Sequence, residues 1–93
     1  MAETEVWRAA NLLMESWEDG VVVYNLESGS THLLNPTAGE VLGCLAAAPA
    51  NATDLSRRLA VQSDVEYDHE LDQKIRELLE HLDFLGLIQP TTE

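Results

Sequence analysis

Histidine is the side chain that most often builds catalytic and metal sites, and its spacing in this 93-residue chain builds neither. His69 and His81 lie twelve residues apart, about 18 Å along a helix, which is too far to share a metal ion. His69-Glu70 begins like the helical zinc-protease motif, but that motif needs a second histidine where this chain has Gln73. His32 stands alone in its segment. The sequence therefore predicts solvated or hydrogen-bonded histidines, with no metal site and no cofactor.

The candidate nucleophiles also lack a base. Cys44 lies in an apolar stretch with no basic neighbour in sequence to lower its pKa, which favours an inert core residue. Ser28-Gly29-Ser30 lacks the strand–nucleophile–helix context of a hydrolase elbow and indicates a turn. A single cysteine excludes an intramolecular disulfide and is typical of a reducing compartment. We expect a protein that is not an enzyme.

Acidic residues outnumber basic ones by 17 to 5, which gives a net charge of −12. This charge repels phosphate backbones and anionic membrane surfaces. It suits a cationic or neutral partner as well as it suits a merely soluble surface. No apolar run approaches the ~20 residues of a membrane helix, and the N-terminus has no apolar signal segment. We expect a cytoplasmic protein that binds neither nucleic acid nor membrane.

The elements that position the remaining residues begin with short strands and turns. The turn at 18–20 contains Gly20, which tolerates the positive φ of a tight hairpin, and a second turn surrounds Gly29. Short turns make neighbouring strands antiparallel. Before the first strand, residues 7–10 are expected to form an irregular or strand-like segment. Three strands are predicted, at residues 12–17, 21–25 and 31–34. The alternation of 12–17 is impure, whereas the β-branched residues Val21–Val23 followed by Tyr24 make 21–25 the clearest strand.

Three helices are expected after the strands. Asn35 can cap the first with its side-chain oxygen, and Pro36 suits the first helical position. Thr53 is expected to cap a short second helix, and the third runs from about residue 68 to 85 before Gly86 ends it. Leucine and isoleucine recur at helical spacing in the third helix. Its predicted buried face consists of Leu71, Ile75, Leu78, Leu82 and Leu85.

The order of these elements predicts a single α+β domain over residues 1–93, in which a three-stranded antiparallel sheet is followed by three helices. Residues 1–5 and 90–93 are expected to be loose ends, and Leu87-Ile88 to fold back onto the core. The run Val21–Tyr24 is apolar on both faces, although helices can cover only one. A homodimer contact, a bound peptide or the segment with Trp7 would cover the other face, and internal cover by Trp7 or Trp17 is equally favoured.

The third predicted strand, Thr31 to Leu34, has no successor strand to pair with. An unpaired strand edge is a template for another chain. The residues therefore favour a binding module for an extended peptide over an enzyme.

Residues at the junction of the third strand and first helix, and at the end of the third helix, resemble the PqqD-like peptide chaperones, also called RiPP recognition elements. They are Leu34-Asn35-Pro36, Ala38, Val41-Leu42, Leu78, Leu82 and Gly86-Leu87-Ile88. Trp17, Val22-Val23-Tyr24 and residues 28–34 are similar to a branch associated with an HPr-kinase-like protein. The chain departs from the family at Ala48-Pro49, where the family often has Asp-Gly, and the form of that connection stays open.

The resemblance implies a winged-helix-like fold and a non-catalytic role in cofactor or natural-product biosynthesis. Such a domain holds the leader of a ribosomally made precursor peptide for a modifying enzyme, such as a radical-SAM or HPr-kinase-like protein. The peptide adds as a strand beside the third strand and packs against the third helix. Carried onto this chain, the peptide-binding residues are Thr31, His32, Leu33, Leu34, Leu71, Lys74, Ile75 and Leu78.

Two alternatives remain at this point. One is a winged-helix transcriptional regulator, although positions 64–83 hold eight acids and only Lys74 and Arg76 as bases. The other is a structural subunit that dimerises through its sheet.

Overall fold

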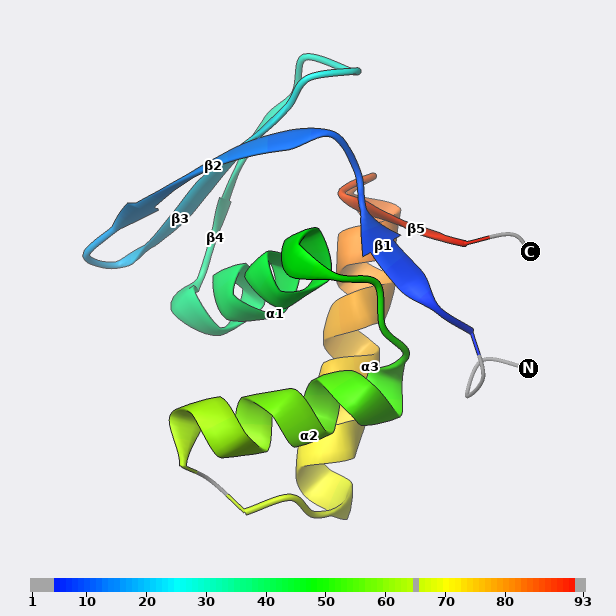
Figure 1. Cartoon of the computed structure of the whole chain (residues 1–93). Helices are drawn as coiled ribbons and strands as arrows, with labels where there is room; N and C mark the ends of the chain where they lie inside the picture. The colour runs from blue at the N-terminus through cyan, green and yellow to red at the C-terminus, as the bar shows by residue number, and fades with distance from the viewer. Residues whose placement is uncertain (1–4, 65, 92–93) are drawn as a thin grey trace.

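The computed structural model describes residues 5–64 and 66–91, and its elements confirm the predicted fold class (Figure 1). Strands β2, β3 and β4 form one antiparallel sheet in that order, and three helices follow them. A second sheet joins β1 to β5. The elements are β1 (Trp7–Ala9), β2 (Leu12–Trp17), β3 (Gly20–Asn25), β4 (Thr31–Leu34), α1 (Pro36–Ala47), α2 (Ala52–Ser63), α3 (His69–Phe84) and β5 (Ile88–Pro90).

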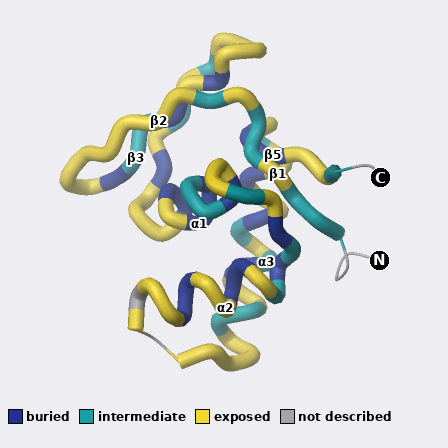
Figure 2. The backbone as a smooth tube through the Cα atoms, viewed as in Figure 1, coloured by how far each residue is buried: buried dark blue, intermediate teal, exposed yellow. Residues whose placement is uncertain are grey.

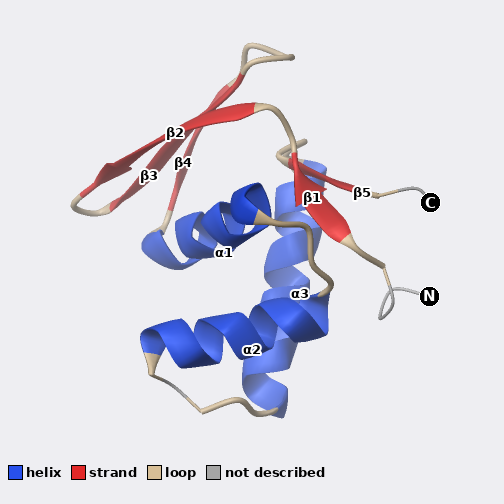
Figure 3. Ribbon diagram, viewed as in Figure 1, coloured by secondary structure: helices blue, strands red, loops and turns tan. Residues whose placement is uncertain are grey.

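Helix α1 packs directly beneath β3 and β4, and α2 lies on the far side of α1 from the sheet (Figure 3). Gly39 permits this close approach, because a Cβ at Gly39 would overlap the side chain of Val21. Leucines from α1, α2 and α3 meet in one core, and each fully buried leucine contributes roughly 1.5–3 kcal/mol to stability. The largest fully buried hydrophobic side chains are Leu42, Leu45, Leu55, Ile75, Leu82 and Leu87.

The two hairpin turns use glycine for different reasons. Gly29 has a φ of +80°, which is the conformation that favours glycine in the turn between β3 and β4. Gly20 does not have a positive φ, so the reason predicted for it is wrong. It is instead the first residue of β3, where any Cβ would collide with the backbone oxygen of Leu34.

Side-chain oxygens cap the helices at their N-termini. Asn35 Oδ1 accepts a 2.8 Å hydrogen bond from the Ala38 N–H, as predicted, and Pro36 is the first residue of α1. The predicted cap of α2 is wrong, because Asn51 rather than Thr53 performs this role. Asn51 Oδ1 accepts from the Asp54 N–H at 2.8 Å, so the helix begins two residues earlier than expected.

The two ends of the described chain pair with each other. Trp7 lies opposite Pro90 in the β1–β5 ladder and is also bridged to Ala50. The Thr91 N–H donates to the Val6 carbonyl at 2.8 Å. Residues 90 and 91 are therefore tied down, contrary to the expected loose end, while residues 1–4, 92 and 93 lie outside the described part. Leu87 and Ile88 are buried, as predicted.

The buried face of α3 is rotated from the predicted one. Ile75 and Leu82 are buried as expected, but the third buried residue of the helix is Leu79. Leu71, Leu78 and Leu85 are only half-buried. The half-buried leucines border a surface that no other described element covers completely.

Candidate functional site

Strand β4 forms one edge of the three-stranded sheet, and its backbone alternates between β3 and solvent. In the β3–β4 ladder, Val21 pairs with Leu34 and Val23 with His32. The Asn25 N–H donates to the Ser30 carbonyl at 2.8 Å, which marks a hydrogen-bonded pair at the turn. Such pairs recur at every second residue of an antiparallel ladder. The backbone groups of His32 and Leu34 therefore point to β3, and those of Thr31 and Leu33 point to the free edge.

The side chains of β4 divide between the two faces of the sheet. Leu34 is buried against the helices, and His32 is half-buried on the same face, where its Nε2 lies 3.2 Å from Ser30 Oγ. Thr31 and Leu33 project from the outer face and are exposed. The free backbone groups at the edge thus belong to the residues whose side chains leave the core.

A groove with a volume of about 580 Å³ begins where β4 ends. Its walls come from the first half of α1, from one face of α3 and from a single leucine of α2. Leu59 and Ile75 are buried at its floor, and Leu71 and Leu78 are half-buried above them. The lining residues are Asn35, Thr37, Glu40, Leu59, Leu71, Lys74, Ile75, Glu77, Leu78 and His81.

The free edge and the groove lie on the same side of the molecule. In Figure 1, β4 and α3 are both at the far side, behind β2 and α1. Asn35 joins them, because it follows β4 directly, caps α1 and lines the groove. Asn35 is thus the residue that connects the β4 edge to the groove.

All four residues predicted on the third helix, Leu71, Lys74, Ile75 and Leu78, line this groove. The four residues predicted on the third strand belong to the adjacent edge strand, but the prediction that all four offer free backbone groups is wrong. The backbone groups of His32 and Leu34 point to β3, so only those of Thr31 and Leu33 are free. Six further lining residues were not among the predicted site residues, namely Asn35, Thr37, Glu40, Leu59, Glu77 and His81. Glu77 and His81 follow Lys74 at helical spacings of three and seven, so the face of α3 would have revealed them. Thr37, Glu40 and Leu59 come from other helices, and their position depends on packing.

The charged residues that line the groove have both signs, because Glu40 and Glu77 are acidic and Lys74 is basic.

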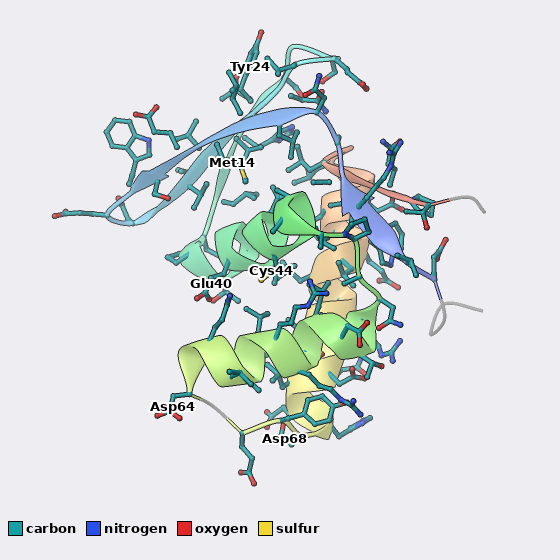
Figure 4. The ribbon with its side chains drawn as sticks, in the orientation of Figure 1. Met14, Tyr24, Glu40, Cys44, Asp64 and Asp68 are labelled. Carbon is teal, nitrogen blue, oxygen red and sulfur yellow. The ribbon has the colours of Figure 1, made fainter. Side chains whose placement is uncertain are left out.

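Glu40 and Cys44 lie on the side of α1 that faces α2 (Figure 4). Burial raises the pKa of the Cys44 thiol, and its Sγ is 3.7 Å from Gln62 Oε1. A thiol held in its neutral form is a poor nucleophile, which agrees with the inert role expected of Cys44.

On the opposite side of α3, Asp72 forms a 2.8 Å ion pair with Arg76, as its spacing of four residues favours. This hydrogen bond lowers the pKa of Asp72, and Ser56 contributes a further hydrogen bond of 3.2 Å from its buried Oγ. The hydrogen bond from Ser56 to Asp72 joins α2 to α3 on the side of α3 that faces away from the groove. It is part of the framework rather than of the surface a ligand would meet.

Among residues 5–64 and 66–91, no three histidine, cysteine, aspartate or glutamate side chains are arranged to hold a metal ion. The described helices include none that is both long enough and apolar enough to cross a membrane.

Comparison with known proteins identifies the fold and the family. No curated protein matches this sequence. A solved structure described as "TbiB1 in Complex with the TbiA(beta) Leader Peptide" superposes with a TM-score of 0.71 and covers 92% of this chain and 99% of that chain. At 14% identity this likeness shows a shared fold. The predicted branch associated with an HPr-kinase-like protein stays a prediction. The family described as Coenzyme PQQ synthesis protein D (PqqD) matches residues 20–88, so the chain belongs to the PqqD family, which confirms the resemblance found in the sequence.

Proposed function

We propose that this protein is a non-catalytic chaperone that holds the leader of a ribosomally made precursor peptide and presents it to a modifying enzyme. The leader adds to β4 as an antiparallel or parallel strand, using the outward backbone groups of Thr31 and Leu33. The single observation that carries the proposal is the continuity of this free edge with the groove beside α3. Main-chain hydrogen bonds at such an edge give affinity, and pockets for alternate side chains give selectivity.

The alternation of a β-strand explains why an edge and a groove belong together. A peptide strand beside β4 would turn every second side chain toward the helices. These side chains would enter the groove against Leu71 and Leu78, with Ile75 and Leu59 at the floor. The aliphatic lining favours apolar anchors in the leader, and the exposed Lys74, Glu77 and His81 would contact the polar groups beside them.

The comparisons support this proposal without naming the ligand. The structure with the same fold holds a leader peptide of its own, and the PqqD family supplies the class of protein. The net charge of −12 favours a leader with basic residues. The enzyme that receives the leader would be of the radical-SAM or HPr-kinase-like type expected from the resemblance.

A peptide selection followed by NMR tests this function. A library of random 12-residue peptides displayed on mRNA is selected against the full chain, and an enriched peptide is titrated into ¹⁵N-labelled protein. We expect affinity in the micromolar range or tighter, because ordering a flexible peptide costs roughly 2–5 kcal/mol. Chemical-shift changes should be confined to residues 31–35 and the groove face of α3. Failure to enrich any peptide, or shifts centred elsewhere, would contradict the proposal.

A further inference from the structure

The opposite edge of the same sheet, β2, is uncovered along its length. The strand order places β2 at the edge away from β4, and α1 packs beneath β3 and β4. Five of its six residues are exposed, including Leu13 (59%), Met14 (38%) and Trp17 (60%). Figure 2 shows this strand as an almost continuous exposed segment. The sequence allowed Trp17 to cover the sheet within the same molecule. The exposure of Trp17 shows that it does not.

The β2 edge also lacks the features that prevent strands from pairing with other chains. Natural edge strands are usually short, bulged, or interrupted by proline or lysine. Strand β2 has six residues in unbroken register with β3, and its sequence LLMESW contains neither proline nor lysine. Its one charge is Glu15, and no lysine or arginine occurs anywhere between Arg8 and Arg57.

The ladder identifies which backbone groups are free. The Leu26 N–H donates to the Asn11 carbonyl at 2.9 Å, which marks a hydrogen-bonded pair at the start of the β2–β3 ladder. By alternation, Leu13, Glu15 and Trp17 bond to β3. The N–H and C=O groups of Leu12, Met14 and Ser16 then point away from β3 and toward solvent.

We propose that two copies of this chain pair through β2, antiparallel and across a two-fold axis at Met14, to form a continuous six-stranded sheet. In this register Met14 of one copy lies opposite Met14 of the other, and Leu12 lies opposite Ser16. The three residues of each strand whose backbone groups point away from β3, Leu12, Met14 and Ser16, then all form complete hydrogen-bonded pairs. A second copy fits this edge because the two-fold register satisfies all three pairs of free backbone groups and places no two charged side chains directly opposite each other.

The neighbouring registers are less favourable for reasons visible in the structure. A two-fold axis at Glu15 would place two glutamates directly opposite each other, which destabilises a strand pair. An axis at Leu13 would require Ser16 to pair with Ala10 of the other copy, but the Ala10 N–H already donates to the Leu87 carbonyl at 2.9 Å. With the axis at Met14, Glu15 instead lies opposite Leu13.

The same register covers apolar surface on the outer face. Trp17 of one copy lies diagonal to Leu13 of the other, within the reach of an aromatic side chain. Strand β4 is at the far edge of each half-sheet, so both peptide edges stay open. Dimerisation through β2 is therefore independent of peptide binding at β4.

The charge of the protein determines how this association responds to salt. Two copies that each carry −12 repel one another, and salt screens that repulsion. Sedimentation velocity of the full chain at 50 and 500 mM NaCl tests the proposal. We expect a species of twice the 10.3 kDa monomer mass, with a dissociation constant that falls at least about threefold at the higher salt.

Variants on β2 locate the interface. Met14→Lys places two like charges at the axis, and Met14→Pro removes an outward N–H without touching the β3 ladder, so both should weaken dimerisation at least about tenfold. Val61→Lys makes the same kind of change at a solvent-exposed site of α2 and should leave the dimer intact. Circular dichroism confirms that each variant is folded.

Disulfide trapping fixes the register. In a Cys44→Ala background, Met14→Cys should form a covalent dimer under oxidising conditions, because paired Cα atoms in a hydrogen-bonded pair lie about 5.5 Å apart. Ser16→Cys should not, because its two copies would lie four residues apart along the strands. A protein that stays monomeric at ~500 µM in high salt, or a dimer that survives both Met14 variants, overturns the proposal.

Discussion

The side-chain amide of Asn25 donates a 3.1 Å hydrogen bond to the backbone carbonyl of Gly86, which ties the β3–β4 turn to the C-terminal end of α3. Asn25 is buried, and its Oδ1 accepts from the N–H groups of Glu27 and Ser28 at 2.9 and 3.1 Å. Gly86 has a φ of +80°, and the Leu87 N–H behind it bonds to the Leu82 carbonyl to close the helix. Because β4 follows this turn, the contact sets the position of the strand edge relative to the groove.

Removing the Asn25 side chain should therefore lower the free energy of unfolding by more than a substitution in a turn usually does. Asn25→Ala leaves the Gly86 carbonyl and two turn amides without their partner, and we expect the free energy of unfolding to fall by about 1–3 kcal/mol. Ser28→Ala, an exposed change in the same turn, should cost less than about 0.5 kcal/mol. Urea denaturation measures both. Equal effects of the two substitutions would argue against a structural role for the Asn25–Gly86 contact.

Two glycines of α1 should respond in opposite directions to the same substitution. Gly39→Ala forces a methyl group against Val21 and should destabilise the protein by about 1–3 kcal/mol, since α1 must move away from β3. A Cβ at Gly43 meets nothing within 4 Å. Gly43→Ala should therefore stabilise the helix by up to about 1 kcal/mol. Thermal unfolding followed by circular dichroism compares the two, and a stabilising Gly39→Ala would contradict the packing described here.

Proline on β4 should separate peptide capture from folding. Leu33→Pro removes an N–H that faces the free edge, so the fold should survive while affinity for a selected peptide falls about fivefold or more. His32→Pro removes an N–H that bonds to β3 and should lower stability by about 2 kcal/mol or more. Fluorescence anisotropy measures peptide affinity, and urea denaturation measures stability. Unchanged affinity in a folded Leu33→Pro variant would locate the peptide elsewhere.

The Asp72–Arg76 pair should contribute stability that depends on pH. The hydrogen bond from Arg76 holds the pKa of Asp72 below its ordinary value, so the folded state favours the ionised carboxylate. This contribution is complete above the ordinary pKa of aspartate and is lost as the pH falls through the lowered pKa of the folded state.

Asp72→Asn should accordingly destabilise the protein by about 1 kcal/mol at pH 7, and the difference should shrink below about pH 4. Glu80→Gln, which changes an exposed carboxylate on the same helix, supplies the control. Urea denaturation at pH 7 and pH 3 gives the comparison. A difference that grows on acidification would have the wrong sign.

Local sequence was sufficient for the elements that depend on neighbouring residues. The three β-branched residues Val21–Val23 predicted the central strand. Asn35-Pro36 predicted the start of α1, and Gly86 predicted the end of α3. The wrong N-cap of α2 has a different origin, because it involves a contact between residues that are far apart in the sequence. Asn51 and Thr53 are both good N-cap residues. Which of them caps α2 depends on Ala50, the residue before Asn51, which is bridged to Trp7.

Local sequence predicted only part of the candidate site. The periodicity of α3 placed Leu71, Lys74, Ile75 and Leu78 on one face, because helical spacing alone determines which side chains are neighbours. That Glu40 and Leu59 line the same groove, and that Leu79 replaces Leu78 at the core, depends on how the three helices pack.

The sequence by itself determined the order of β2 to β4 and of the three helices, and the acidic charge, since each follows from composition or from residues a few positions apart. It did not predict β5, and the β4 edge is open because β5 pairs with β1 instead. Only the tertiary structure decided that β1 pairs with β5, that Asn25 reaches Gly86 across 61 positions, and that the β4 edge opens onto a groove. The physical reason is that these contacts join segments far apart in the chain. Their geometry arises when the whole core is buried at once, and no local pattern of residues encodes it.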